Sequence, residues 1–156
     1  MAAKPQVWRM AFRSGSQGPD YWDLCFRHGV AVLGMWSPHD LSSCSQEDLK
    51  GLYRQRCEWL NMEPTSTNLS NHRKFGFLMG EGDIIYAKLG TVLVGRGTIL
   101  EPYLYNCHKK WLPRSLSLWG FFRKVQWDKN FEPISKAEVP RVFEAPLHTV
   151  LQLQGE

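Results

Sequence analysis

Alternation of apolar and polar positions predicts a strand close to the start of the chain. Between residues 7 and 12, one face is apolar and the other holds Arg9, which is the period of a β-strand. The apolar face consists of Trp8, Met10 and Phe12. A compact apolar run at residues 30–33, bounded by glycines, predicts a second, buried strand.

Helix signals are concentrated in the first half of the chain. A short helix is expected from Pro19 to His28, because proline suits the first helical position and Gly29 suits the stop. The clearest helix begins after Ser45, which forms a capping-box pattern with Asp48 and precedes an apolar stripe at helical spacing. A weaker stripe predicts another helix over residues 68–79.

The second half of the chain is typical of strands, expected over residues 83–89, 93–100, 121–127 and 149–153. Gly95 and Gly97 lie inside a strand pattern and indicate a bulge or a close backbone approach. The 156 residues suffice for one domain with its own core. We therefore expect a single domain over residues 1–156 in the α+β class, with one curved mixed sheet or partly closed barrel flanked by helices.

Composition favours an intracellular protein, cytoplasmic or associated with the nucleus or nucleoid. No apolar run is long enough to span a bilayer, so a membrane partner is not expected, and the N-terminus lacks the apolar core of a secretory signal. The four cysteines are too few and too scattered for a disulfide scaffold, so reduced thiols are expected.

One segment combines positive charge with aromatic side chains. Residues 102–127 contain no Asp or Glu. Lysine and arginine neutralise phosphates, and aromatic faces stack on bases, so this pattern is typical of nucleic-acid binding. The plainer interpretation is a solvated basic loop beside core aromatics. The cations of the segment are Lys109, Lys110, Arg114, Arg123 and Lys124.

The seven tryptophans divide by position. Trp8 and Trp127 fall on alternating strand positions and are expected in the core, Trp59 in the core or at its rim, and Trp22 in either setting. Three others stand in loops or at element ends, where binding residues concentrate. They are either ligand contacts or hydrophobic lids over the ends of a barrel. These three are Trp36, Trp111 and Trp119.

Signals for catalysis and for metals are weak, so no cofactor or metal is expected. The chain contains no glycine-rich phosphate loop, no GxSxG and no HExxH. Cys25 and His28 have ligand-type spacing, but no second pair completes a zinc site. Asp20 and Asp23 are explained by the helix dipole at a helix start. An enzyme stays open only if its site is assembled from scattered residues.

The order of several short motifs resembles the PUA-like superfamily. More narrowly, it resembles EVE and YTH domains and the N-terminal modified-DNA recognition domains of McrB-type restriction systems. The agreement in element order extends over nearly the whole chain. The motifs are AFRS at 11–14, Gly29-Val30, GDIIYAKLGT at 82–91, VGRGTI at 94–99, KWLP at 110–113, LWGFF at 118–122 and KVQW at 124–127.

The resemblance implies a reader of modified nucleobases that flips one nucleotide into an aromatic cage. Trp111 matches the family's loop tryptophan that stacks on the base, and Trp119 lies near the position of the third cage wall. The family usually has a cage tryptophan directly after the Gly-Val pair, where this chain has Ala31, and Trp36 is the candidate replacement. Arg13 and Ser14 match the mouth of the pocket.

The sequence thus favours a noncatalytic module that binds methylated cytosine or adenine in DNA or RNA. The five cations of residues 102–127 would hold phosphates, and Asn106 would read a base edge at the pocket mouth unless it is a turn residue. A nuclease or motor component, fused or separate, stays open as a partner. The alternatives are a general RNA-binding PUA or ASCH-type domain, a small nucleotide-processing enzyme, and a peptide-binding module.

Overall fold

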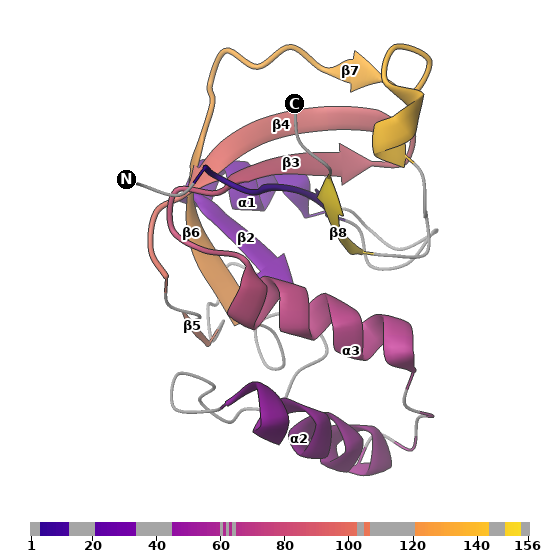
Figure 1. Ribbon diagram of the computed structural model, residues 1–156. Coiled ribbons are helices and arrows are strands. Elements are labelled where there is room, and N and C mark those ends of the chain that lie inside the picture. The colour runs from indigo at the N-terminus through magenta and orange to yellow at the C-terminus, as the bar shows by residue number, and fades with distance from the viewer. Residues whose placement is uncertain are drawn as a thin grey trace.

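The computed structural model describes residues 4–12, 21–33, 45–59, 61, 63, 65–102, 105–106, 121–143 and 149–153 (Figure 1). Its helices are α1 (Trp22–His28), α2 (Gln46–Trp59), α3 (Ser66–Arg73), the π-helical turn η1 (Lys74–Leu78) and the 3-10 turn η2 (Pro140–Phe143). Its strands are β1 (Val7–Ala11), β2 (Val30–Leu33), β3 (Ile84–Leu89), β4 (Val92–Ile99), β5 (Tyr105–Asn106), β6 (Phe121–Trp127), β7 (Ile134–Ser135) and β8 (Val150–Leu153).

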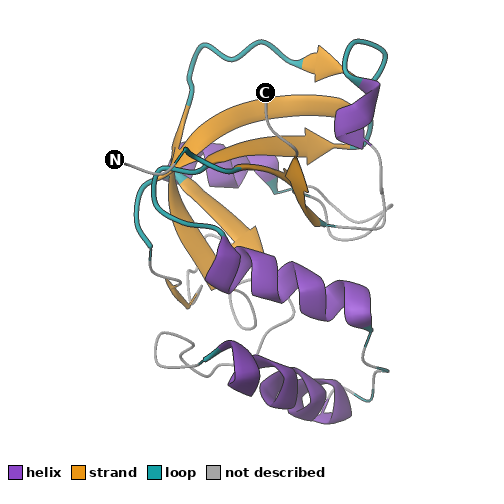
Figure 2. Ribbon diagram, in the orientation of Figure 1, coloured by secondary structure: helices purple, strands orange, loops and turns teal. Residues whose placement is uncertain are grey.

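The strands of the described residues form one curled sheet in the order β2-β6-β4-β3-β1-β8, while β5 pairs with β6 and β7 with β4. The sheet is mixed, because β1 and β3 are parallel and β3 and β4 antiparallel. It curls into a half-barrel flanked by helices, with α2 packed on α3 and η1 against β8 (Figure 2). The α+β class and the curved mixed sheet expected from the sequence are confirmed.

Local signals set the ends of the first two helices. Gly29 ends α1 in the left-handed region at φ 64°, and its N–H donates to the Cys25 carbonyl, as the predicted glycine stop requires. The predicted capping box is confirmed at α2. There the Asp48 N–H donates to Ser45 Oγ over 3.2 Å, and the Ser45 N–H donates to Asp48 Oδ2 over 3.3 Å.

The third helix differs from its prediction at both ends. The expected span was residues 68–79, whereas α3 begins at Ser66 and changes at Lys74 into the wider turn η1. The Met79 N–H, which donates to the Lys74 carbonyl, closes this turn. A π-helical turn inserts an extra residue into the helical period, which the apolar spacing did not indicate.

Strand β4 passes close to an aromatic ring at Gly95, as the sequence predicted for a glycine inside a strand. A side chain at Gly95 would collide with the Trp22 indole, so only glycine leaves room for the ring. The register between β3 and β4 also shifts at Ala87 and Lys88, which is a local bulge. Of the two predicted alternatives, the close backbone approach is therefore confirmed at Gly95.

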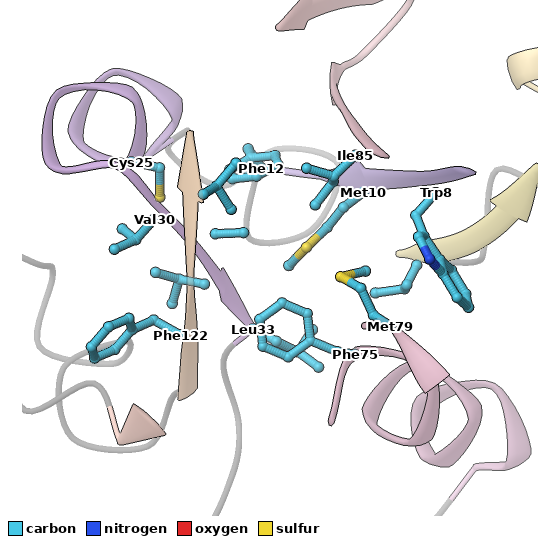
Figure 3. Packing of buried hydrophobic residues seen from close by; sticks show 14 of the residues in the cluster. Trp8, Met10, Phe12, Cys25, Val30, Leu33, Phe75, Met79, Ile85 and Phe122 are labelled. Carbon is cyan, nitrogen blue, oxygen red and sulfur yellow. The ribbon is translucent and has the colours of Figure 1, made fainter. Parts of the chain in front are cut away.

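The core fills the inside of the curved sheet (Figure 3). Trp8, Met10 and Phe12 have no exposed surface, and Trp127 is almost fully buried, so the core assignments of Trp8 and Trp127 are confirmed. Burial of each such side chain contributes about 1.5–3 kcal/mol. Trp22 is partly buried, and its ring meets Phe12 edge-on at 5.3 Å between centroids.

The helices of the described residues are all too short or too polar to cross a bilayer.

Candidate functional site

Most residues of the predicted site lie outside the described part of the chain. The pocket-mouth residue Asn106 is described at the end of β5, although its side chain is not. Arg123 and Lys124 are fully described. The remaining predicted residues, all outside the described ranges, are Trp36, Trp111, Trp119, Arg13, Ser14, Lys109, Lys110 and Arg114.

The described residues that flank the predicted cage meet at one place. Leu33, the last residue of β2, pairs with Phe121, the first residue of β6. Asn106, the last residue of β5, pairs with the same Phe121. The chain therefore leaves β2, leaves β5 and enters β6 at one end of the sheet. We call Leu33, Asn106 and Phe121 the anchor residues.

The predicted pocket mouth is divided by the same strand geometry. Arg13 and Ser14 follow Phe12, whose N–H donates to the Lys88 carbonyl at the end of β3. Strand β3 is antiparallel to β4, and β4 is antiparallel to β6, so Phe12 lies at the opposite end of the strands from Phe121. Asn106 thus pairs with Phe121, whereas Phe12, the residue before Arg13 in the sequence, lies at the other end of the strands.

Arg123 is a correction to the predicted phosphate contacts. Its side chain has no exposed surface, so it does not meet a phosphate at the protein surface. Its Nη1 donates to the carbonyls of Phe75 and Met79, and its Nη2 donates to the carbonyl of Glu101. Arg123 therefore joins β6 to η1 and to the chain after β4. This role was not predicted from the sequence, because an arginine within a basic segment is typical of an exposed surface group.

Lys124 is exposed at the outer side of β6 and remains a candidate for phosphate contact. Its Nζ lies 3.2 Å from Glu101 Oε1, in an ion pair whose lysine side chain is 47% exposed. A pair so accessible to water is weak, and a phosphate competes well with the carboxylate for the ammonium. Ala31 stands where the family that the sequence resembles usually has a cage tryptophan. It is fully buried in β2, so this position does not form a wall of an exposed cage.

The groups considered for catalysis or metal binding are engaged otherwise. Burial raises the pKa of the Cys25 thiol to about 12, so it is a protonated core group. Asp23 forms an exposed ion pair with Arg27 over 3.7 Å within α1. Among the described residues, no three His, Cys, Asp or Glu side chains gather as a metal site would require.

A buried carboxylate that the sequence did not indicate fixes the N-terminal strand. Asp83 Oδ2 accepts from the Trp8 indole N–H and from the Gly80 N–H, and Oδ1 accepts from the Gln6 N–H. These bonds join β1 to the turn before β3. An acid at the first position of a predicted strand was the available signal, but two of its partners, Gln6 and Trp8, lie far away in sequence.

Trp59 is not part of the core. It ends α2 with 65% of its surface exposed, so of the two expected settings, the core or its rim, the core is wrong. Trp59 is therefore an exposed tryptophan on an element separate from the anchor residues.

The fold defines an α+β protein in which a curled mixed sheet is flanked by helices. Within that class, the chain belongs to the family described as Domain of unknown function (DUF8426), which matches residues 8–154. The match includes every residue of the predicted site. A comparison with curated proteins gives no match.

Proposed function

We propose that this protein is a noncatalytic recognition module that binds a methylated cytosine or adenine of DNA or RNA, flipped out of its strand into an aromatic cage. The observation that carries the proposal is the meeting of the three anchor residues. Trp36 follows Leu33 by three residues, and Trp119 precedes Phe121 by two. Trp111 follows Asn106 by five. The segments that carry these three tryptophans therefore leave or enter the sheet at the same end.

The chemistry of these segments suits a flipped base. Stacking between a base and an aromatic ring contributes about 1–3 kcal/mol, and two opposed rings offset the loss of stacking in the strand. Cations beside the cage neutralise the phosphates that flank the flipped nucleotide. The proposed phosphate contacts are Lys109, Lys110, Arg114 and Lys124, with Arg123 removed from the set and assigned to the interior.

The scaffold also favours this function. A curled mixed sheet with helices on its flanks is compatible with the PUA-like superfamily that the motifs resemble. Members of a fold class differ in function, so the proposal depends on the tryptophans and not on the fold alone.

The test compares two tryptophan variants by fluorescence anisotropy with labelled oligonucleotides. The probes carry 5-methylcytosine, 5-hydroxymethylcytosine or N6-methyladenine, each with an unmodified control. Trp111→Ala is expected to lower affinity for the preferred modified probe about tenfold or more, and affinity for the unmodified probe little. Trp59→Ala, which removes an exposed tryptophan elsewhere, should change neither. Equal losses for both probes in Trp111→Ala would refute the cage.

A variant that removes one positive charge distinguishes a module that recognises a modified base from a general RNA-binding domain. Lys110→Ala should weaken modified and unmodified probes by the same factor, because a phosphate contact carries no information about the base. A wild-type protein that binds RNA with steep salt dependence and the same affinity for both probes is a general RNA-binding domain. Turnover of a modified nucleotide that survives Trp111→Ala would instead favour an enzyme.

A further inference from the structure

The side of the sheet that faces away from the core carries a row of cations. Paired residues share a face, so Arg9 of β1, Tyr86 of β3 and Arg96 of β4 lie side by side, opposite the face of Trp8 and Met10. Lys88 is two residues beyond Tyr86 on the same strand. The register continues on this face through Thr98 and Gln126 towards Lys124. We call this side the outer basic face. Its described residues on β1, β3, β4, β6 and β8 include no Asp or Glu.

The cations of this face lie close enough to repel one another. Burial lowers the pKa of Lys88, and the charges of Arg9 and Lys136 lower it further. Lys136 reaches this position because its N–H donates to the Thr91 carbonyl, which holds the end of β7 beside the β3–β4 turn. Neither Lys88 nor Lys136 forms an ion pair with any residue in the described ranges. Repelling cations are stabilised by a bound anion.

An aromatic pair lies within this charged surface. The rings of Tyr86 and Phe131 meet edge-on at 6.2 Å, and both side chains are partly exposed. The Arg96 guanidinium lies 5.9 Å from the Tyr86 ring centroid, within the range of a cation–π contact. The combination of partly exposed rings and cations is typical of a surface for a nucleic-acid strand.

Two described acids near this face are engaged locally, and a third, Glu101, pairs with Lys124. Asp128 follows β6 beside Arg96, and its Oδ1 accepts from the Asn130 N–H without an ion pair to Arg96. Glu138 accepts from the Ser135 hydroxyl in the turn after β7. Arg9 donates to the carbonyl of Val142 in η2 and is fully buried. It therefore adds positive charge under this face but does not contact a ligand directly.

We propose that the outer basic face, through Lys88, Lys136 and Arg96, binds backbone phosphates of the same nucleic-acid strand at a distance from the flipped nucleotide. The inference rests on the proposed function and extends it, because the face leads through Gln126 to Lys124 on β6, the strand that begins at the anchor residue Phe121. Contacts of this face with phosphates do not depend on the base sequence of the nucleic acid. The face sets affinity and salt dependence, whereas the cage sets the preference for a modified base.

The test measures affinity and its salt dependence for Lys88→Ala/Lys136→Ala. We expect about tenfold weaker binding to modified and unmodified probes alike, and a log–log salt slope that is shallower by about 1.4–1.8 for two lost contacts. Lys50→Ala/Arg54→Ala removes two exposed cations of α2 and is the matched control, expected to leave both quantities unchanged. Lys136→Glu, on an exposed turn, provides a second variant if Lys88→Ala perturbs folding.

The outcomes distinguish this inference from the proposed function. If the wild-type protein prefers a modified probe but the double variant binds with unchanged affinity and slope, the inference is overturned and the cage stands. If the double variant alters the preference for the modified base while total affinity is retained, the division of roles is also overturned. If the wild-type protein binds no probe at low salt, both proposals are overturned.

Discussion

At Gly95 the absence of a side chain has a direct structural consequence. The Trp22 indole occupies the space that a Cβ at this position would need, and the ring is held by Phe12 and Trp127. Gly95→Ala should therefore lower the free energy of unfolding by about 1–3 kcal/mol through overpacking. Urea unfolding followed by tryptophan fluorescence measures the change.

The matched control for that variant is Gly51→Ala in α2. A Cβ at Gly51 meets nothing within 4 Å, so alanine should raise helix propensity and stabilise the protein by about 0.5–1 kcal/mol. The two substitutions are chemically identical and have opposite predicted signs. Stabilisation by Gly95→Ala would contradict the close approach of Trp22.

The imidazole of His72 makes stability depend on pH. Burial lowers its pKa to about 3 in the folded protein, whereas the unfolded chain has an ordinary value near 6.5. Between these values the unfolded state binds more protons, so the free energy of unfolding falls as pH drops below about 6.5. The limiting slope is about 1.4 kcal/mol per pH unit. His72→Gln should flatten the dependence measured by urea unfolding across this range, and an unchanged slope would contradict the buried, neutral imidazole.

Individual residues could be predicted from the sequence where one local pattern decides their setting. Alternation placed Trp8 and Trp127 in the core correctly, because a strand with one apolar face has only one way to bury it. Arg123 and Asp83 could not be predicted in the same way. Their partners are carbonyl and N–H groups that only the folded chain brings near, and side-chain type does not encode those partners.

Among the elements, the π-helical turn η1 is hydrogen-bonded by the guanidinium of Arg123, which belongs to strand β6. Arg123 holds the carbonyls of Phe75 and Met79 at the widened turn and the carbonyl of Glu101 beyond β4. Arg123→Met should lower the free energy of unfolding by about 3 kcal/mol or more, because buried acceptors lose charged donors. Arg123→Lys should recover only part of this loss, since one ammonium cannot reach both elements. Thermal and urea unfolding of both variants test this, and wild-type stability of Arg123→Met would contradict it.

The strands of the second half agree with prediction closely because turn residues mark their ends. Strand β6 has the predicted bounds of residues 121–127, and β3 differs from the predicted span by one residue. The change from α3 into η1 could not be predicted, because no proline or glycine marks the point at Lys74 where the hydrogen-bond pattern widens. Arg123, from a strand distant in the sequence, donates to the carbonyls of Phe75 and Met79 at that turn.

At the scale of the whole molecule, the class of fold could be predicted and the strand order could not. The helix-then-strand order indicates α+β, but the pairing of β2 with β6 joins residues 88 to 94 positions apart. This non-local pairing forms the anchor residues, on which the proposed site depends. The pairings of β1 with β3, of β3 with β4 and of β4 with β6 place Phe12, the residue before Arg13 in the sequence, at the opposite end of the strands, which no local motif indicates.

At this scale, we propose that two surfaces of the molecule contact one strand of nucleic acid. The tryptophan segments that follow or precede the anchor residues would select the base, and the outer basic face would hold the backbone. Base selection and backbone affinity are therefore expected to be separable by substitution, with Trp111 affecting the first and Lys88 the second.

The most direct test of the central claim is equilibrium binding of the wild-type protein to matched oligonucleotides in DNA and RNA form. Each pair differs only by one 5-methylcytosine, 5-hydroxymethylcytosine or N6-methyladenine. If the tryptophans form a cage for a modified base, at least one modified probe binds about tenfold more tightly than its unmodified partner at the same salt concentration. Equal affinity within each pair, in both DNA and RNA, would contradict recognition of a modified base.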